Sequence, residues 1–325
     1  MKTKLTLFTI LTLLVGILFL LGITSGGFNI PLQQLPEILL NPEQHPIESQ
    51  IIFELRLPRV IAAFIVGALL ALAGAVMQTL LTNPLADPYI LGISGGSATG
   101  ALLAMLFGLG GFWLTTGAFA GAVFTIFAVF SLTFGARDHS NNRLLLTGVV
   151  ISAGWGAVIS LILSIAPNTD LRGMLFWLMG DLSGAKDFTI GGSVLLLGAA
   201  LLIPMARPLN LLTRGDLSAK ALGVETGILR LQLYLITSLL TATAVTIGGS
   251  IGFIGLITPH ILRIIIGSDH RLLLPASLLL GGAILVLADT LARTIIAPQQ
   301  LPVGVITALI GVPLFLYLLR RDGQR

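Results

Sequence analysis

The chain has 325 residues, of which 55% are hydrophobic and only 10% charged, and its mean hydropathy is +1.00. Soluble domains carry about 25% charged residues, so this composition excludes a water-soluble protein of this size and predicts a polytopic membrane protein. There are no cysteines, which excludes disulfides, cysteine-ligated metals and a thiol nucleophile. The net charge of +4 comes from single Lys and Arg residues beside apolar segments, which is typical of membrane topology rather than nucleic-acid binding.

Ten apolar segments are predicted to cross the membrane as helices, so the fold class is an all-α polytopic membrane protein with one domain over residues 1–325. No segment alternates apolar and polar residues as the strands of a membrane barrel do. The first segment resembles a signal peptide, but it is long and lacks an A-x-A motif, so we expect an uncleaved span. The segments are 5–24, 52–81, 89–108, 112–134, 144–166, 188–206, 229–248, 252–267, 272–297 and 303–319.

The eighth segment, 252–267, is short for a span, because helical residues rise about 1.5 Å each and it reaches only about 24 Å. Counting it as a span places both termini and the connections 83–87, 136–143, 207–230 and 268–271 on one side, with 13 of the 18 Lys and Arg residues. By the positive-inside rule that side is cytoplasmic. The 13 residues are Lys2, Lys4, Arg137, Arg143, Arg207, Arg214, Lys220, Arg230, Arg263, Arg271, Arg320, Arg321 and Arg325, with Arg56, Arg59, Arg172, Lys186 and Arg293 opposite.

Small residues mark two features of the predicted bundle. The glycine-rich turn at 248–255, "GGSIGFIG", precedes the short segment, and non-helical backbone at membrane depth needs protein or a water-filled cavity around it. We therefore expect a short helix enclosed by protein. Gly67, Ala71 and Ala75 share one face of the second segment and allow a neighbouring helix to approach closely.

The sequence offers few groups for covalent chemistry or ion coupling. There is no GxxxxGK[ST] phosphate loop, so the chain does not hydrolyse a nucleotide by that route. The acidic residue within a long apolar run is Asp289, and Arg293 one helical turn later favours an ion pair over an ion-coupling site. The GISG sequence at 92–95 would make Ser94 the nucleophile of an intramembrane protease with His260 as base, but such short Gly/Ser matches are common among 38 glycines.

The connection at about 207–230 is polar and is predicted to be cytoplasmic. Within it, "GDLSAKALGVETG" at 215–227 predicts a short helix with Asp216 or Ser218 as N-cap and Gly223 as its C-terminal stop. Its small apolar surface suits insertion into a groove on a partner, and an ordinary interfacial loop helix is the alternative.

Long blocks of the sequence resemble the FecCD-type permease subunits of type II ATP-binding-cassette importers, which carry iron–siderophore complexes, haem or cobalamin. The blocks are "LRLPRVIAAFIVGALLALAGAVMQTLLTNPLADPYILGISGGSATGA" (55–101), "LRGMLFWLMGDLSG" (171–184), "SAKALGV" (218–224) and 249–294 with 301–319. The resemblance implies ten helices per subunit and a second permease subunit, expected to be an identical copy. It also implies a cytoplasmic ATPase that uses the ATP, and a periplasmic or lipid-anchored binding protein. No cofactor, metal or nucleic acid is expected on this chain.

The resemblance also implies roles for individual residues. Ser218, Ala219, Ala221, Leu222 and Gly223 match the family's coupling helix, which sits in a cleft of the ATPase. Arg56, Arg59 and Arg293 match basic docking points for acidic residues of the binding protein, with anchoring of helix ends as the alternative for Arg59 and Arg293. Ser140, Asn141 and Asn142 fall at the family's cytoplasmic gate, although three such residues could also form a turn and cap the next helix.

We therefore expect a non-enzymatic permease in the bacterial cytoplasmic membrane, with both termini in the cytoplasm, that works by alternating access. Ferric siderophore or haem is the first choice of cargo and cobalamin the close alternative. An ion-coupled carrier and an intramembrane protease are the hypotheses from other classes. A heterodimer with a similar permease stays open beside the homodimer.

Overall fold

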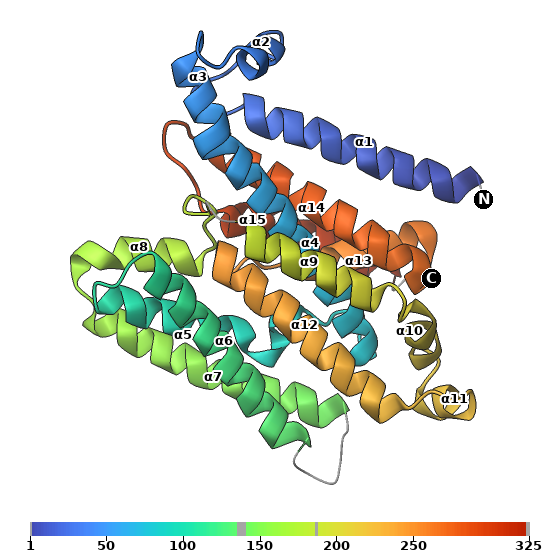
Figure 1. The fold of residues 1–325 in the computed structure, drawn as a ribbon. Helices are drawn as coiled ribbons and strands as arrows, with labels where there is room; N and C mark the ends of the chain where they lie inside the picture. Colours follow the sequence, from blue (N-terminus) through green and yellow to red (C-terminus); the bar gives the residue numbers. More distant parts are fainter. Residues whose placement is uncertain (1, 135–140, 186–187, 323–325) are drawn as a thin grey trace.

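The computed structural model describes residues 2–134, 141–185 and 188–322, and these residues form helices joined by turns, with no strand among them. Figure 1 shows α4 in the middle of the bundle, with α5, α6, α7 and α8 grouped at the lower left. The helices are α1 (Lys2–Thr24), α2 (Leu35–Leu40), α3 (Pro46–Gln50), the π-helix η1 (Ile51–Arg56), α4 (Leu57–Leu80), the 3₁₀ helix η2 (Pro88–Leu91), α5 (Ile93–Leu106), α6 (Phe112–Phe134), α7 (Asn141–Ile165), α8 (Asn168–Leu178), α9 (Thr189–Leu202), α10 (Ala206–Leu212), α11 (Asp216–Ala221), α12 (Thr226–Gly248), α13 (Ile254–Ile266), α14 (His270–Thr294) and α15 (Val303–Asp322).

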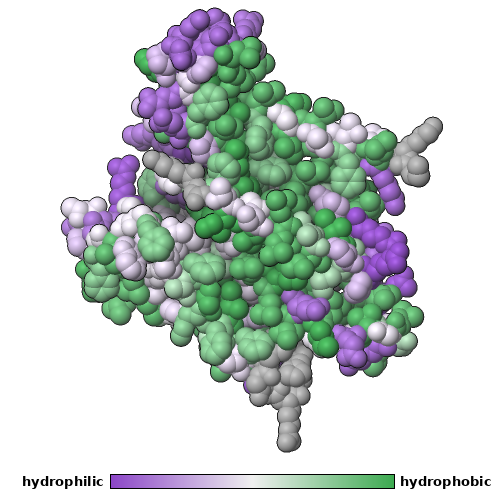
Figure 2. All heavy atoms as spheres, in the orientation of Figure 1, coloured by the Kyte–Doolittle hydropathy of each residue, from purple (hydrophilic) through white to green (hydrophobic). Residues whose placement is uncertain are grey.

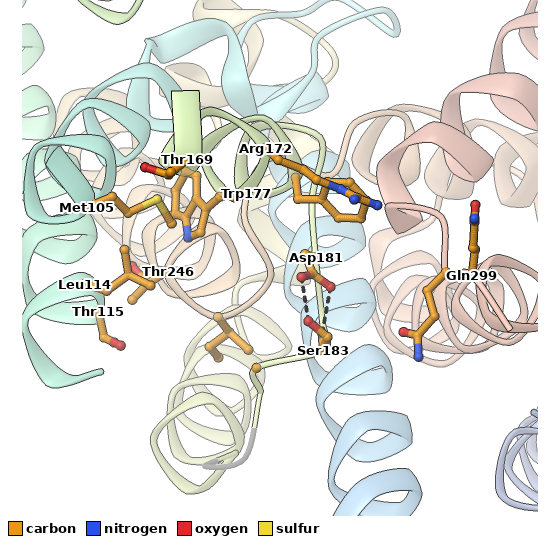
Figure 3. Close-up of a pocket in the computed structure, with 15 residues that line it drawn as sticks. Met105, Leu114, Thr115, Thr169, Arg172, Trp177, Asp181, Ser183, Thr246 and Gln299 are labelled. Atoms are coloured by element: carbon orange, nitrogen blue, oxygen red, sulfur yellow. Dashed lines mark hydrogen bonds between the residues drawn. The ribbon is translucent and has the colours of Figure 1, made fainter. Parts of the chain in front are cut away.

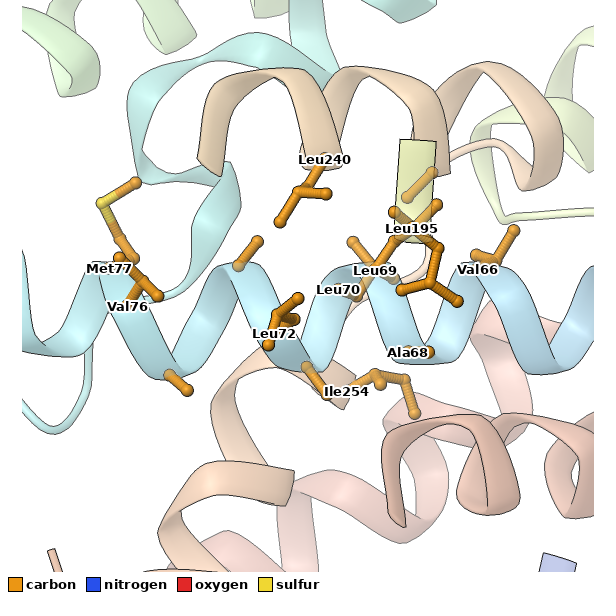
Figure 4. Packing of buried hydrophobic residues seen from close by; sticks show 14 of the residues in the cluster. Val66, Ala68, Leu69, Leu70, Leu72, Val76, Met77, Leu195, Leu240 and Ile254 are labelled. Carbon is orange, nitrogen blue, oxygen red and sulfur yellow. The ribbon is translucent and has the colours of Figure 1, made fainter. Parts of the chain in front are cut away.

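Helix α4 is the central element of the bundle. It is apolar all round and contacts α9, α12, α13 and α14, so almost every side chain from Val60 to Leu80 is buried. Figure 4 shows this core, in which Leu69, Leu70 and Met77 of α4 lie among side chains of the surrounding helices. A helix that is apolar on all faces is stable only when it is surrounded, and here it is surrounded by protein.

Each of the ten predicted spans contains a helix in the structure, although the bounds differ. Among the described residues, six helices are long and apolar enough to cross a membrane, and the bent pair α9–α10 would make a seventh. Helices α5, α13 and α15 are apolar but shorter, which for α13 agrees with the expected short helix. The all-α membrane fold is confirmed, and the count of ten spans stays a prediction.

The structure corrects the sixth predicted span, 188–206. The helix stops at Leu202, and α10 leaves at an angle of 64° after a break of three residues. Pro204 lies in that break, and its nitrogen has no N–H with which to continue the helical hydrogen bonds. The bend turns α10 and α11 away from the direction of α9. Three short helices outside the predicted spans, α2, α3 and α8, were not expected.

Polar structure gathers at two opposite ends of the bundle. The start of α1, the end of α15 and the helices α10 and α11 lie along the right side of Figure 1, and α2, α3 and α8 lie toward its top and left. Following the sidedness predicted from charge, we call these the inner and the outer end. Figure 2 shows apolar residues across most of the face between them, with hydrophilic residues over α2–α3 and near α10–α11. This distribution suits a bilayer around the part of the bundle that lies between its two ends.

Glycines allow the backbones of α4 and its neighbours to approach closely. A Cβ on Gly67 would lie 2.3 Å from the carbonyl oxygen of Gly281 in α14, and one on Gly74 would lie 1.9 Å from that of Gly255 in α13. Ala71 also packs at this crossing, since its Cβ would be 2.3 Å from a Cβ on Gly281. The predicted close approach at Gly67 and Ala71 is therefore present, and Gly74 adds a second one.

The approach of α4 to α13 gives a stability prediction. Gly74→Ala should force the two backbones apart, so we expect a loss of about 1–3 kcal/mol, which is typical of overpacked cores. The measurement is thermal unfolding in detergent. Gly154→Ala on α7 is the matched control, because nothing lies within 4 Å of the added methyl group. A lower midpoint for both variants alike would contradict the contact assigned to Gly74.

Candidate functional site

A pocket of about 730 Å³ opens at the outer end of the bundle. It lies between α8 and the turn that follows it, the facing ends of α5, α6 and α12, and the α14–α15 connection; Figure 3 shows its wall. The volume falls in the range of about 300–1,000 Å³ that is usual for small-molecule sites. The lining residues are Met105, Leu114, Thr115, Thr169, Arg172, Gly173, Phe176, Trp177, Asp181, Ser183, Gly184, Thr246, Ile247, Gln299 and Gln300.

The pocket wall combines aromatic rings with a few polar groups. The Arg172 guanidinium carbon lies 5.7 Å from the ring centre of Phe176, one turn further along α8. Asp181 is turned toward its own loop, where its carboxylate accepts hydrogen bonds from the Ser183 amide at 2.8 Å and hydroxyl at 2.5 Å. The carboxylate is therefore held by local donors, whereas Arg172 lies over an aromatic face, so the wall suits an anionic or aromatic ligand.

A buried charge cluster lies beside the pocket. The Asp289 carboxylate of α14 accepts from Arg59 Nε of α4 at 2.9 Å and from Arg293 Nε at 3.0 Å. The Asp289 side chain is 1% exposed, so both arginines share one desolvated carboxylate. The predicted pair between Asp289 and Arg293 is present, and Arg59, 230 residues away in sequence, is a partner that was not expected.

The three arginines expected at the docking surface are all engaged inside the chain. Arg59 also donates to Gln300 Oε1 at 2.7 Å, and Arg293 donates to the carbonyl oxygen of Gly22 at 3.0 Å. Arg56 donates to the carbonyl oxygens of Ile23, at 2.8 Å, and Thr24, at 2.9 Å, and it also bonds that of Phe28. Each arginine is at most 7% exposed. Docking through them stays a prediction, and it would require these contacts to open.

The turn between α12 and α13 is held at the level of the middle of α4. The Tyr89 hydroxyl donates to the Ile251 carbonyl oxygen at 3.0 Å and accepts from the Ile251 amide at 3.1 Å. Ser94 Oγ donates to Ser250 Oγ at 2.9 Å. The serine considered as a nucleophile therefore bonds this turn, and the turn is lined by protein as expected.

The predicted coupling segment contains the short helix α11 at the inner end. Its C-terminus is a Schellman motif, in which the Gly223 amide bonds the Lys220 carbonyl and the Val224 amide bonds the Ala219 carbonyl, each at 3.0 Å. Gly223 has a φ of +82°, so the predicted stop at this glycine is confirmed. Leu222 is 62% exposed and Leu217 86%, and Ser218 and Ala221 are also exposed.

Two expectations for this segment need correction or detail. Gly215 occupies the N-cap position, and no side chain caps the helix. The prediction of Asp216 or Ser218 as the N-cap was therefore wrong. Asp216 instead accepts a charge-assisted hydrogen bond from Arg230 of α12 at 2.7 Å. Ala219 is fully buried against the chain, so it supports α11 and is not part of its exposed surface.

A polar network at the inner end joins α10 to α14 and α4. Asn210 Oδ1 accepts from the His270 amide at 2.9 Å and lies 2.7 Å from its Nδ1, and His270 Nε2 lies 2.8 Å from Thr79 Oγ1. Asn210 Nδ2 donates to Asp269 at 2.8 Å. That bond and the Arg271 amide lower the pKa of Asp269, so its charge is retained at neutral pH. The network could not be predicted from the sequence, because Asn210 and His270 are isolated polar residues 60 positions apart.

The expected gate falls partly outside the described residues. Ser140 lies outside them, and Asn141 and Asn142 begin α7 but their side chains are not among those described. The gating role of all three stays a prediction. Within the described part of the chain, no group of three His, Cys, Asp or Glu side chains could hold a metal ion.

Comparison with known proteins decides the family. The model of the FecCD transport family matches residues 13–321. The chain belongs to this family. A haemin transport permease of Yersinia pestis, HmuU, is 42% identical over 83% of this chain and 83% of its own length. A permease of Bacillus subtilis, YvrB, named only as an uncharacterised ABC transporter permease, is also 42% identical, over 93% of this chain and 90% of its own length.

Further relatives extend the range of cargo in the family. The BtuC cobalamin permease of Halobacterium salinarum is 41% identical over 92% of this chain and 81% of its own length. A solved inward-facing ABC transporter, described as of the metal-chelate type, has a TM-score of 0.87 and 35% identity over 97% of this chain and 99% of its own. The chain is thus a permease subunit of a type II ABC importer and not an enzyme. Such a permease works with a separate ATPase, a substrate-binding protein and a second permease subunit.

The buried cluster gives a second stability prediction. Asp289→Ala leaves two buried guanidinium groups without their shared carboxylate, so we expect a loss of about 3–5 kcal/mol, as for other broken buried pairs. The measurement is the thermal midpoint in detergent. Glu37→Ala is the control, because its 3.6 Å pair with His45 is 58% exposed on the Glu37 side and such pairs contribute about 0–1 kcal/mol. Equal shifts in the two variants would mean that the cluster contributes little to stability.

Proposed function

We propose that this permease imports an iron chelate, either a ferric siderophore or haem, with cobalamin as the alternative cargo. It works in the bacterial cytoplasmic membrane with both termini in the cytoplasm, and a second copy of the same chain completes the pathway. The partner ATPase uses the ATP, and this chain binds no cofactor. The binding protein delivers the chelate at the outer end.

The outer pocket is the observation that carries the choice of cargo. Haem and many siderophores present carboxylates or aromatic groups, and Arg172 beside Phe176 and Trp177 provides a cation and two rings at the pocket wall. A corrin ring carries neutral amide groups at its rim, and an amide binds a guanidinium group more weakly than a carboxylate does. The chemistry of the wall therefore favours an acidic, aromatic chelate.

The exposed surface of α11 supports a coupling role. Leu217 and Leu222 present apolar side chains at the inner end, on a helix whose end is fixed by the Schellman motif at Gly223. A short rigid helix with exposed leucines suits insertion into a groove on the ATPase. Ser218, Ala221 and Leu222 would contact the ATPase, and Ala219 and Gly223 would hold the shape of the helix.

A substitution in α11 tests ATP-driven uptake. Gly223→Arg should abolish uptake of labelled ferric siderophore, haemin or cobalamin, because a φ of +82° strains a non-glycine residue and the new side chain enlarges the α11 surface. Uptake is compared in cells with the gene, without it, and with the variant.

Gly110→Arg is the matched control, since that glycine lies at the outer end with nothing within 4 Å of an added Cβ. It should keep both membrane insertion and uptake. Uptake that survives Gly223→Arg, or that depends on the gene for none of the three chelates, would contradict the proposal.

The pocket makes a prediction about cargo. Arg172→Gln should lower uptake of an anionic chelate about tenfold, because a hydrogen bond to a charged group contributes about 1.5–3 kcal/mol. The measurement is the concentration dependence of uptake for haemin and a ferric siderophore. Equal uptake by Arg172→Gln and the parent protein at every concentration would remove the reason for preferring these chelates over cobalamin.

A further inference from the structure

At the inner end, Arg230 joins the coupling helix to α4. Its guanidinium donates to Asp216 in the first turn of α11 at 2.7 Å and to the carbonyl oxygen of Leu80 at 2.9 Å. The Arg230 side chain is 12% exposed, so the link lies mostly away from water. One side chain of α12 thus fixes the start of α11 to the last residue of α4.

A second contact reaches the same point of α4 from α10. Asn210 of α10 bonds His270, whose Nε2 lies 2.8 Å from Thr79 Oγ1. Thr79 and His270 are buried. Helix α10 is therefore connected to Thr79 through His270 of α14, and α11 is connected to Leu80 through Arg230 of α12. Thr79 and Leu80 are consecutive residues at one end of α4, the most enclosed helix of the bundle.

At the outer end, α4 is attached to the pocket wall. Arg59, in the first turn of α4, donates to Gln300 Oε1 at 2.7 Å, and Gln300 lines the pocket from the α14–α15 connection. Asp289 fixes the other side of the Arg59 guanidinium at 2.9 Å. The position of Gln300 therefore depends on where α4 carries Arg59.

Between these contacts α4 is an unbroken, closely packed helix. Thr79 and Arg59 are 20 residues apart, which in an α-helix corresponds to about 30 Å. The segment is enclosed by α9, α12, α13 and α14, and its glycines meet backbone atoms of α13 and α14 directly. A close-packed helix shifts or tilts as a unit more readily than it compresses, because cores deform little.

We propose that α4 is a mechanical link between the coupling helix and the outer pocket, with Arg230 and the Asn210–His270 pair as its inner attachment and Arg59–Gln300 as its outer attachment. A displacement of α11 moves α4, and α4 moves Gln300 at the pocket wall. This rests on the proposed coupling role of α11. It assigns positioning roles to Arg230, Asn210, His270 and Gln300.

The first test uses the purified full chain without partners, and measures amide hydrogen exchange by mass spectrometry. Arg230→Gln removes one of the two inner attachments, so exchange over 295–302 at the opposite end should rise about fivefold, the effect of losing one hydrogen bond. The outer turn at 107–111 is the internal reference and should not change. Arg207→Gln, an exposed arginine of α10, is the matched variant and should leave both segments unchanged.

The second test measures the fluorescence of a tryptophan in the pocket of the assembled importer. Trp177 lines the pocket, and replacing Trp113 and Trp155 by Phe leaves it as the one tryptophan of the chain's three. Addition of ATP to the complex with its ATPase should change Trp177 emission. Gln300→Ala should remove most of that change, whereas Gln299→Ala should retain it, because Gln299 lines the same pocket but the bond to Arg59 is made by Gln300.

The outcomes separate the two proposals. Unchanged exchange over 295–302 in Arg230→Gln, or a full Trp177 response in Gln300→Ala, would overturn the link through α4 while leaving ATP-driven import intact. If no ATPase assembles on the chain, the proposed function fails, and the exchange measurement still decides whether the two ends of α4 are connected. A rise over both 295–302 and 107–111 would indicate general loosening and would also count against the link.

Discussion

The close contact of α4 with the helices around it is the constraint on which the rest of the structure depends. Gly67 and Gly74 bring its backbone against the carbonyl oxygens of Gly281 and Gly255, at separations that exclude even a methyl group. In a bilayer the lipid is as apolar as leucine, so helices gain little from burying apolar area and associate mainly through such packing. Helices α9, α12, α13 and α14 pack around this one, and polar groups lie at its two ends.

Those polar groups satisfy one another within the chain. At the outer end Asp289 is shared by Arg59 and Arg293, and at the inner end Asn210 connects His270 with Asp269. Unpaired charges and amides are expensive away from water, so these residues are held in defined positions. The pocket and α11 both adjoin such a cluster, which gives each of them a rigid support. The movements that transport requires are therefore movements of whole helices and not of these side chains.

Much of this structure could be predicted from the sequence, because apolar length and charge asymmetry directly reflect the membrane. The spans and the short α13 were predicted in this way, and the stop at Gly223 was predicted from the preference for glycine after a helix. The break after Leu202 had a local signal in Pro204 that the apolar composition of the segment hid. The pairing of Arg59 with Asp289 had no local signal, since the partners are 230 residues apart and an arginine at a helix end is equally suited to the membrane surface. For the same reason the burial of the three expected docking arginines could not be read from their positions.

The contact between Tyr89 and Ile251 has a consequence for the tightness of the membrane. One phenol both donates to and accepts from the backbone of the same residue, at 3.0 and 3.1 Å, so the amide and the carbonyl of Ile251 are satisfied without water. An interrupted helix inside a bilayer usually recruits water molecules, and a file of water molecules conducts protons. At Ile251 the hydroxyl takes the place that a water molecule would occupy, so this residue adds no water-binding backbone group to the interior of the membrane.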